Sequence, residues 1–139
     1  KRCIIPSTGY FEPHYNPDGT KAPYYAHLPE TEIFSIGGLW SSWKDPDTGE
    51  DIESYTMITI GANELMSQVH NGGNSPFRMP LIIDPNNVDR WLDPDLPDQE
   101  IKTLFRKFPS ERMEAYEVSK AMWSPRNMMD RRIIEKSAN

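Results

Sequence analysis

The apolar positions change their spacing about halfway along the chain, from the alternation typical of strands to the spacing typical of helices. Two Pro- and Gly-containing segments, Asn16-Pro17-Asp18-Gly19 and Asp45-Pro46-Asp47-Thr48-Gly49, predict tight turns between strands. The first half predicts strands over residues 4–15, 22–27, 33–43 and 52–60. We expect the last two of these strands to form a long hairpin.

The second half predicts three short helices separated by loops. The first covers residues 63–70 with Asn63 as its N-cap, the second begins at residues 84–87, and the third begins at Pro97. A short buried strand over residues 79–83 and an extended stretch over 116–122 complete the pattern. The apolar faces of the helices are predicted to be Leu65, Met66 and Val69; Val88, Trp91 and Leu92; and Ile101, Leu104, Phe105 and Phe108.

Composition limits the class of protein. The chain has 139 residues, 37% of them hydrophobic, which suits one modest domain, and no apolar run approaches the roughly 18 residues of a membrane span. The single cysteine, Cys3, excludes an internal disulfide and a cysteine-based zinc site. The net charge of −6 excludes a uniformly basic nucleic-acid binder, but not a local basic groove. The sequence opens on Lys1 without a secretory signal, and we expect it to be a fragment of a longer protein.

The first candidate for chemistry is Glu12, which follows the aromatic pair Tyr10-Phe11 and precedes Pro13-His14. A carboxylate in apolar surroundings has a raised pKa and can carry protons near neutral pH. Glu12 could equally be an acid at the end of a strand that faces water.

The second candidate is His70, which ends the first predicted helix, with Arg78 following after a Gly-rich loop. An imidazole at this place can titrate or donate a proton, but it can also serve only as a helix cap. Arg78 could bind a phosphate with two hydrogen bonds, or could form a structural ion pair with one of the many acids.

Taken together, these segments resemble the SRAP family, the SOS-response-associated peptidase-like proteins, which include bacterial and eukaryotic proteins that crosslink to abasic sites. The landmarks occur in family order over residues 1–119. They are Arg2-Cys3-x-x-Pro6-x-x-Gly9-Tyr10-Phe11-Glu12, Lys21-x-Pro23-Tyr24, Gly38-Leu39-Trp40, Tyr55-Thr56-Met57-Ile58-Thr59, Ala62-Asn63, Val69-His70, Arg78-Met79-Pro80, Trp91-Leu92 and Tyr116-x-Val118-Ser119.

The resemblance implies an α+β fold, a curved, barrel-like mixed β-sheet with short flanking helices. Residues 1–123 would form the C-terminal two-thirds of a single SRAP-like domain, and residues 124–139 a polar, basic tail. It implies covalent capture of abasic sites in single-stranded DNA through an N-terminal cysteine, a self-processing peptidase (hydrolase) activity, and a role in the DNA-damage response and repair.

By the same resemblance, the catalytic residues are Glu12, which would shuttle protons, and His70, which would act as a general acid on the sugar oxygen. Arg78 and Thr59 would contact the DNA backbone. No metal and no cofactor is implied. The expected partner is single-stranded DNA with abasic sites and not a membrane, in the bacterial cytoplasm with the nucleoid or in a eukaryotic nucleus.

The sequence departs from the family pattern in four places. The nucleophilic cysteine and an upstream Asn-Ala-Arg-type segment are expected before Lys1, and Cys3 belongs instead to an interior motif where a small buried thiol is expected. By the resemblance, the family commonly has one residue between its histidine and its arginine, whereas seven residues, 71–77, separate His70 from Arg78 here. Pro13 stands where many members have Trp. We expect the fragment alone to be unable to crosslink. The alternative is a non-catalytic module with the same fold that binds single-stranded DNA or another partner.

Overall fold

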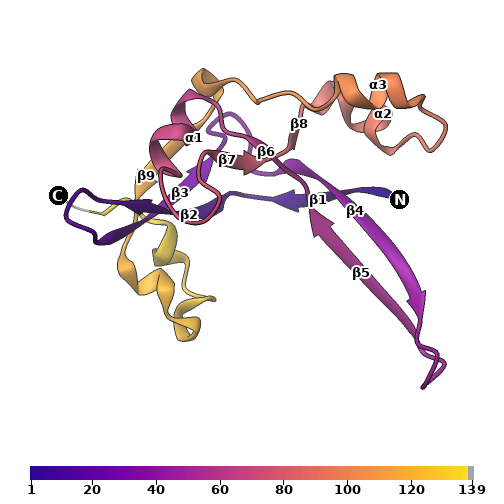
Figure 1. The fold of residues 1–139 in the computed structure, drawn as a ribbon. Coiled ribbons are helices and arrows are strands. Elements are labelled where there is room, and N and C mark those ends of the chain that lie inside the picture. The colour runs from indigo at the N-terminus through magenta and orange to yellow at the C-terminus, as the bar shows by residue number, and fades with distance from the viewer. Residues whose placement is uncertain (138–139) are drawn as a thin grey trace. The chain divides into compact units, whose positions relative to one another are not determined.

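The chain passes back and forth between two units, each built from three separate stretches of sequence. A computed structural model describes residues 1–137 (Figure 1). Unit 1 consists of Lys1–Ser7, Phe34–Ile60 and Pro80–Phe108, and unit 2 of Thr8–Ile33, Gly61–Met79 and the residues from Pro109 onwards.

The sheet of unit 1 is antiparallel and has the order β1-β4-β5, with the short strand β8 also pairing with β4. The predicted long hairpin is confirmed: β4 and β5 run side by side (Figure 1), with Lys44 opposite Asp51 at its far end. Gly49 has φ +74° in the connecting turn, a conformation that favours glycine. The strands are β1 (Arg2–Ser7), β4 (Phe34–Lys44), β5 (Asp51–Met57) and β8 (Ile82–Ile83).

The core of unit 1 surrounds Trp91, which is fully buried, as predicted. Its indole Nε1–H donates to the carbonyl oxygen of Cys3 at 2.7 Å, so the polar edge of the ring is satisfied while the rest is packed. Leu81, Ile83 and Leu104 complete the buried cluster. The helical elements here are η1 (Pro85–Asn87), α2 (Val88–Leu92) and α3 (Asp98–Thr103).

Two residues of the predicted apolar helix faces lie on the surface instead. Leu92 is 42% exposed and Phe105 is 44% exposed. The helices are shorter than the spacing suggested: α2 ends at Leu92, and α3 ends before Leu104. Leu104 and Phe108 are buried, but they lie in the segment after the helix, where helical spacing no longer decides which side chain points inward.

The sheet of unit 2 is also antiparallel, with the order β2-β3-β9. The prediction of one strand over residues 4–15 was wrong, because the chain leaves β1 at Ser7, in unit 1, and starts β2 at Tyr10, in unit 2. The predicted turn at Asn16–Gly19 is confirmed and joins β2 to β3, with Gly19 at φ +83°. The strands are β2 (Tyr10–Tyr15), β3 (Lys21–His27) and β9 (Glu114–Glu117).

Other predicted elements are shorter than expected. Of the extended stretch predicted over 116–122, only the first two residues lie in a strand, at the end of β9. A 3₁₀ turn follows, capped by the Ser119 side chain, which accepts the Ala121 N–H. The predicted strands over 52–60 and 79–83 are each interrupted, at Ile58 and Leu81. The remaining elements are β6 (Thr59–Gly61), α1 (Glu64–Val69), β7 (Arg78–Pro80), η2 (Ser110–Arg112), η3 (Lys120–Trp123), η4 (Pro125–Asn127) and η5 (Arg131–Ile134).

These elements confirm the predicted α+β class with short helices. In the described residues the strands form separate antiparallel sheets, and none of the sheets closes into a barrel. Over the same residues, the helices are too short and too polar to cross a membrane. The division into a domain of residues 1–123 and a tail of residues 124–139 stays a prediction, with residues 138–139 outside the described chain.

Candidate active site in unit 2

Glu12 lies inside β2, rather than at a strand end as the sequence suggested. Strand alternation places Tyr10, Glu12 and His14 on one face of β2, and Glu12 is directly opposite Tyr24 of β3. The carboxyl group is half-buried, and this burial raises its pKa above the usual range for glutamate. The charge of His70 acts in the opposite direction and lowers the same pKa, so the two side chains lie within electrostatic reach of each other.

His70 is positioned by α1. The predicted N-cap is confirmed, because the Asn63 side-chain oxygen accepts the N–H of Met66 at 2.9 Å. Met66 and Val69 are buried and fix the helix in unit 2, and the backbone N–H of His70 donates to the Met66 carbonyl at its end. The His14 ring also contacts the Val69 carbonyl at 3.1 Å. This bond ties the strand that carries Glu12 to the end of the helix that carries His70.

The His70 imidazole contacts the backbone of Arg78 through Nδ1. The Arg78 N–H lies 3.3 Å from Nδ1, and the Arg78 carbonyl oxygen lies 3.0 Å from the same atom. A neutral ring with a lone pair on Nδ1 can accept from the N–H, and a ring protonated at Nδ1 can donate to the carbonyl. Both protonation states therefore have a partner at this nitrogen.

The seven residues between His70 and Arg78 are fastened to β2. The Asn71 side chain accepts the Tyr15 N–H at 2.8 Å and donates to the Tyr15 carbonyl at 3.0 Å. Gly72 lies against the Tyr15 ring, where a Cβ would come within 2.6 Å of ring carbons. The loop closes at its base, because the Phe77 N–H donates to the His70 carbonyl at 2.8 Å. This loop is thus docked on the strand that carries Glu12.

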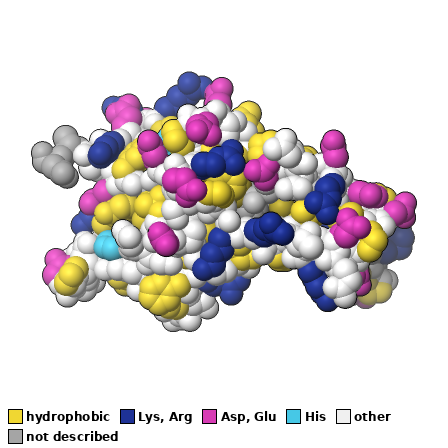
Figure 2. All heavy atoms as spheres, turned by 90° about the horizontal axis from the view of Figure 1, so that it is seen from above, with side chains coloured by type: hydrophobic (Ala, Val, Ile, Leu, Met, Phe, Trp, Pro, Cys, Tyr) yellow, Lys and Arg dark blue, Asp and Glu magenta, His cyan; other side chains and the backbone are white. Residues whose placement is uncertain are grey.

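Three of the four residues named from the sequence therefore belong to unit 2. Glu12 and His70 interact electrostatically, and the exposed Arg78 touches the His70 ring with its backbone. Thr59 is half-buried on β6 and belongs to unit 1. On the face drawn in Figure 2, basic and acidic side chains are interspersed.

The similarity of this chain to known proteins includes the residues of this candidate site. The family model described as SOS response associated peptidase (SRAP) matches residues 1–125. The chain belongs to the SRAP family. It is 34% identical over 128 residues to the abasic site processing protein YoqW of Bacillus subtilis (strain 168), an alignment that covers 91% of this chain and 54% of the relative. The abasic site processing protein HMCES of Gallus gallus is 29% identical over 147 residues, with 91% of this chain and 41% of the relative covered.

A solved structure agrees with this assignment. The crystal structure of a protein from Bacteroides thetaiotaomicron matches with a TM-score of 0.90 and 36% identity, covering 99% of this chain and 57% of that chain. The SRAP chain therefore spans about half the length of the curated relatives above and of this structure.

Two residues of this candidate site were not singled out from the sequence. Tyr10 shares a face of β2 with Glu12, which its spacing of two residues could have indicated. Asn71 contacts Tyr15, 56 residues earlier in the chain, and no local pattern signals that contact.

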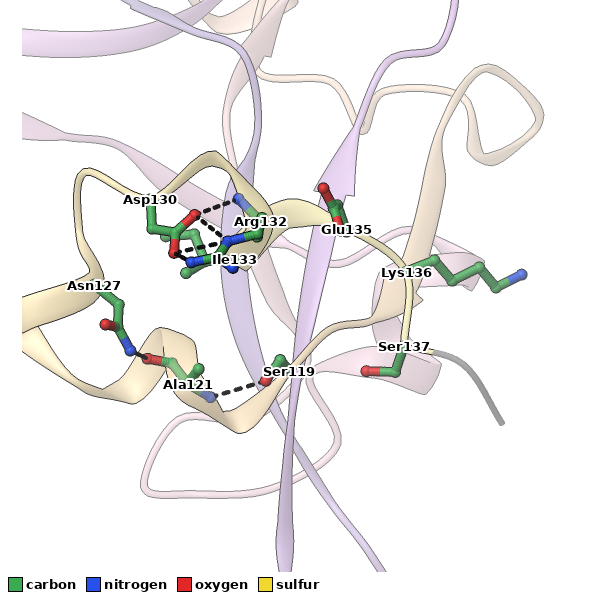
Figure 3. Close-up of a pocket in the computed structure, with 9 residues that line it drawn as sticks. All are labelled: Ser119, Ala121, Asn127, Asp130, Arg132, Ile133, Glu135, Lys136 and Ser137. Carbon is green, nitrogen blue, oxygen red and sulfur yellow. Dashed lines mark hydrogen bonds and ion pairs between the residues drawn. The ribbon is translucent and has the colours of Figure 1, made fainter.

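Hollows in other parts of the described chain include the following two. One, of about 570 Å³ in unit 1, is lined by the half-buried Cys3, with Trp40 and Tyr55. The other, of about 430 Å³, lies within residues 119–137 (Figure 3), where Asp130 and Arg132 pair with each other at 2.6 Å. Neither hollow is lined by Glu12, His70, Arg78 or Thr59.

Proposed function

We propose that the intact protein processes abasic sites in single-stranded DNA by capturing the lesion covalently. The observation that carries the proposal is the half-buried Glu12 carboxyl, with its raised pKa, within electrostatic reach of His70. Such a pair can accept and return protons near neutral pH. The names of the relatives YoqW and HMCES as abasic site processing proteins support the choice of substrate.

The chemistry starts at the ring-opened aldehyde of the lesion. The α-amine of an N-terminal cysteine, supplied from outside these 139 residues, adds to the carbonyl carbon and forms a C–N bond. The resulting hydroxyl takes a proton and leaves as water, which gives a Schiff base. The cysteine sulfur then adds to the imine carbon and its proton passes to nitrogen, which closes a thiazolidine ring. No oxidant or reductant is required.

Two side chains would move the protons in this sequence. Glu12, whose pKa is raised by burial, would give a proton to the departing hydroxyl and recover one from the attacking amine. His70 acts as a general acid on the sugar ring oxygen, which opens the ring and exposes the aldehyde. Because the Arg78 backbone engages Nδ1 of His70, Nε2 is the nitrogen assigned to this transfer. The same Glu12 would activate water for removal of the initiator methionine, a self-processing peptidase step.

The DNA would be held through its backbone rather than by base reading. Arg78 is exposed beside His70 and would contact a phosphate next to the lesion, and Thr59 would add a polar contact to the same strand. Since the chain carries a net charge of −6, binding would depend on this local contact and weaken with salt. The protein would act where the DNA is, in the bacterial cytoplasm or the eukaryotic nucleus.

The test is adduct formation by the full-length protein with single-stranded DNA that carries one abasic site, followed on a denaturing gel. Glu12→Gln and His70→Gln should each slow adduct formation by about 100-fold or more, the usual contribution of a general acid or base. Glu111→Gln and His27→Gln are matched controls, which change an exposed glutamate and a histidine outside the pair and should crosslink at the wild-type rate.

Two results would overturn the proposal. If the wild-type protein binds abasic DNA but leaves no adduct after denaturation, the protein is the non-catalytic module. If Glu12→Gln and His70→Gln crosslink as fast as the two controls, the Glu12–His70 pair does not perform the proton transfers.

A further inference from the structure

The hydroxyl group of Tyr10 is buried without a hydrogen-bond partner among the described residues. It is the single buried side-chain oxygen or nitrogen for which this holds in that part of the chain. Buried hydroxyl groups in folded proteins nearly always have a partner, because an unsatisfied donor has lost its water without replacement. The arrangement therefore calls for an acceptor that joins Tyr10 in the working protein.

The position of Tyr10 indicates where that acceptor would come from. Tyr10 and Glu12 are two residues apart in β2, so their side chains leave the same face of the strand. The aromatic residues Phe11 and Tyr25 pack together on the opposite face, with ring centroids 5.2 Å apart. The hydroxyl thus belongs to the face of the sheet that carries the proposed site.

The state of the hydroxyl is also defined by its surroundings. Burial, and secondly the negative charge of Glu12, raise the pKa of Tyr10 far above its usual range. The phenol therefore keeps its proton near neutral pH, and Tyr10 can act as a hydrogen-bond donor. It does not serve as a base.

We propose that Tyr10 is a further catalytic residue, whose O–H donates a hydrogen bond to the oxygen that leaves the lesion as water. This inference rests on the proposed function. In the step concerned, the carbon–oxygen bond of the carbinolamine breaks, and its electron pair goes to the oxygen. Glu12 supplies the proton, water departs, and nitrogen forms the C=N bond. Tyr10 keeps its own proton and stabilises the charge that develops on the oxygen. Its donor is satisfied only while the lesion is bound, so the bond favours the reaction and not the empty protein.

The test compares Tyr10→Phe with Tyr25→Phe in the full-length protein. Tyr25 is a buried tyrosine of the same sheet, and its hydroxyl donates to the Thr8 carbonyl at 2.9 Å, away from the Glu12 face. Both changes remove one hydroxyl and keep the ring. The rate of adduct formation is measured in single turnover over a range of abasic DNA concentrations, and the melting temperature is measured without DNA.

The expected result is a split between rate and stability. Tyr10→Phe should lower the maximal rate by about 100-fold, the lower end of the range for loss of one donor to a developing oxyanion. Its melting temperature should equal or exceed that of the wild type, because the lost hydroxyl had no partner in the described chain. Tyr25→Phe should show the reverse, a lower melting temperature and an unchanged maximal rate. In the double variant Tyr10→Phe with Glu12→Gln, the two rate losses should be less than multiplicative, because both act on one oxygen.

Other results would overturn the inference and can be told apart from failure of the proposed function. If the wild type crosslinks and Tyr10→Phe crosslinks equally fast, Tyr10 has no catalytic role, although the proposed function stands. If Tyr10→Phe loses both rate and melting temperature, Tyr10 is a structural residue. If the wild type forms no adduct, the proposed function itself fails and takes this inference with it.

Discussion

Replacing Asn71 with Leu tests whether the loop after His70 depends on its attachment to β2. The Asn71 side chain makes two hydrogen bonds to one backbone unit, from the Tyr15 N–H at 2.8 Å and to the Tyr15 carbonyl at 3.0 Å. Because β2 is an edge strand of its sheet, these bonds occupy backbone groups that no neighbouring strand pairs. A neutral hydrogen bond contributes about 0.5–1.5 kcal/mol net. Leu has the same branching and number of side-chain heavy atoms as Asn but cannot form either bond, so the free energy of unfolding should fall by about 1–3 kcal/mol.

Urea unfolding of the full-length protein, followed by circular dichroism, measures the difference. The matched control is Asn74→Leu, which makes the same chemical change at an exposed position of the same loop and should alter the free energy of unfolding by less than about 0.5 kcal/mol. The rate of adduct formation should also fall in Asn71→Leu, because Asn71 directly follows His70. Equal stabilities for the two variants would refute the reasoning, since water would then replace Asn71 at no cost.

Two further predictions concern β2 and the glycine that precedes it. Gly9→Ala should destabilise the protein by about 1–3 kcal/mol, because its Cβ would lie 2.3 Å from the ring and hydroxyl of the buried Tyr25; an unchanged melting temperature would mean that Tyr25 moves aside. Glu12→Gln should change how stability depends on pH. Since burial raises the pKa of Glu12, the folded chain keeps a proton that the unfolded chain has already lost, so this residue makes the wild type less stable as pH rises from about 4.5 through the raised pKa. The stability of Glu12→Gln relative to the wild type should therefore increase over that interval and then level off, as measured by urea unfolding at successive pH values; the opposite slope would show that His70, and not burial, dominates at Glu12.

The elements that were predicted correctly are those fixed by local chemistry. The turn ending at Gly19, the hairpin turn ending at Gly49 and the N-cap at Asn63 each depend on residues within a few positions of one another. The division of residues 4–15 into β1 and β2 could not be predicted in this way. Gly9 lies against the Tyr25 ring between these strands, and β1 and β2 belong to different units, but neither relation alters the local alternation of side chains.

The site shows the same difference between local and distant causes. The aromatic neighbours of Glu12 in the sequence are enough to predict a carboxyl group with a raised pKa. The place of His70 at the end of a short helix is enough to predict an imidazole that can donate a proton. That the two side chains interact depends on the contact between His14 and the carbonyl of Val69, which joins residues 55 positions apart. The role of Asn71 arises in the same way, because its bonding partner is the backbone of Tyr15.

The loop over residues 71–77 keeps His70 and Arg78 together although seven residues separate them in the sequence. Phe77 has φ +59°, a left-handed conformation that is rare for an aromatic residue, and this reverses the chain at the end of the loop. Its N–H then reaches the His70 carbonyl at 2.8 Å, and its carbonyl accepts the Ala62 N–H at 2.8 Å. The seven residues are thereby closed off as a side loop, and Arg78 returns to within 3.0 Å of the His70 ring. The number of residues between His70 and Arg78 therefore does not predict how close the two lie. The closure of the loop at Phe77 keeps the imidazole next to the Arg78 backbone.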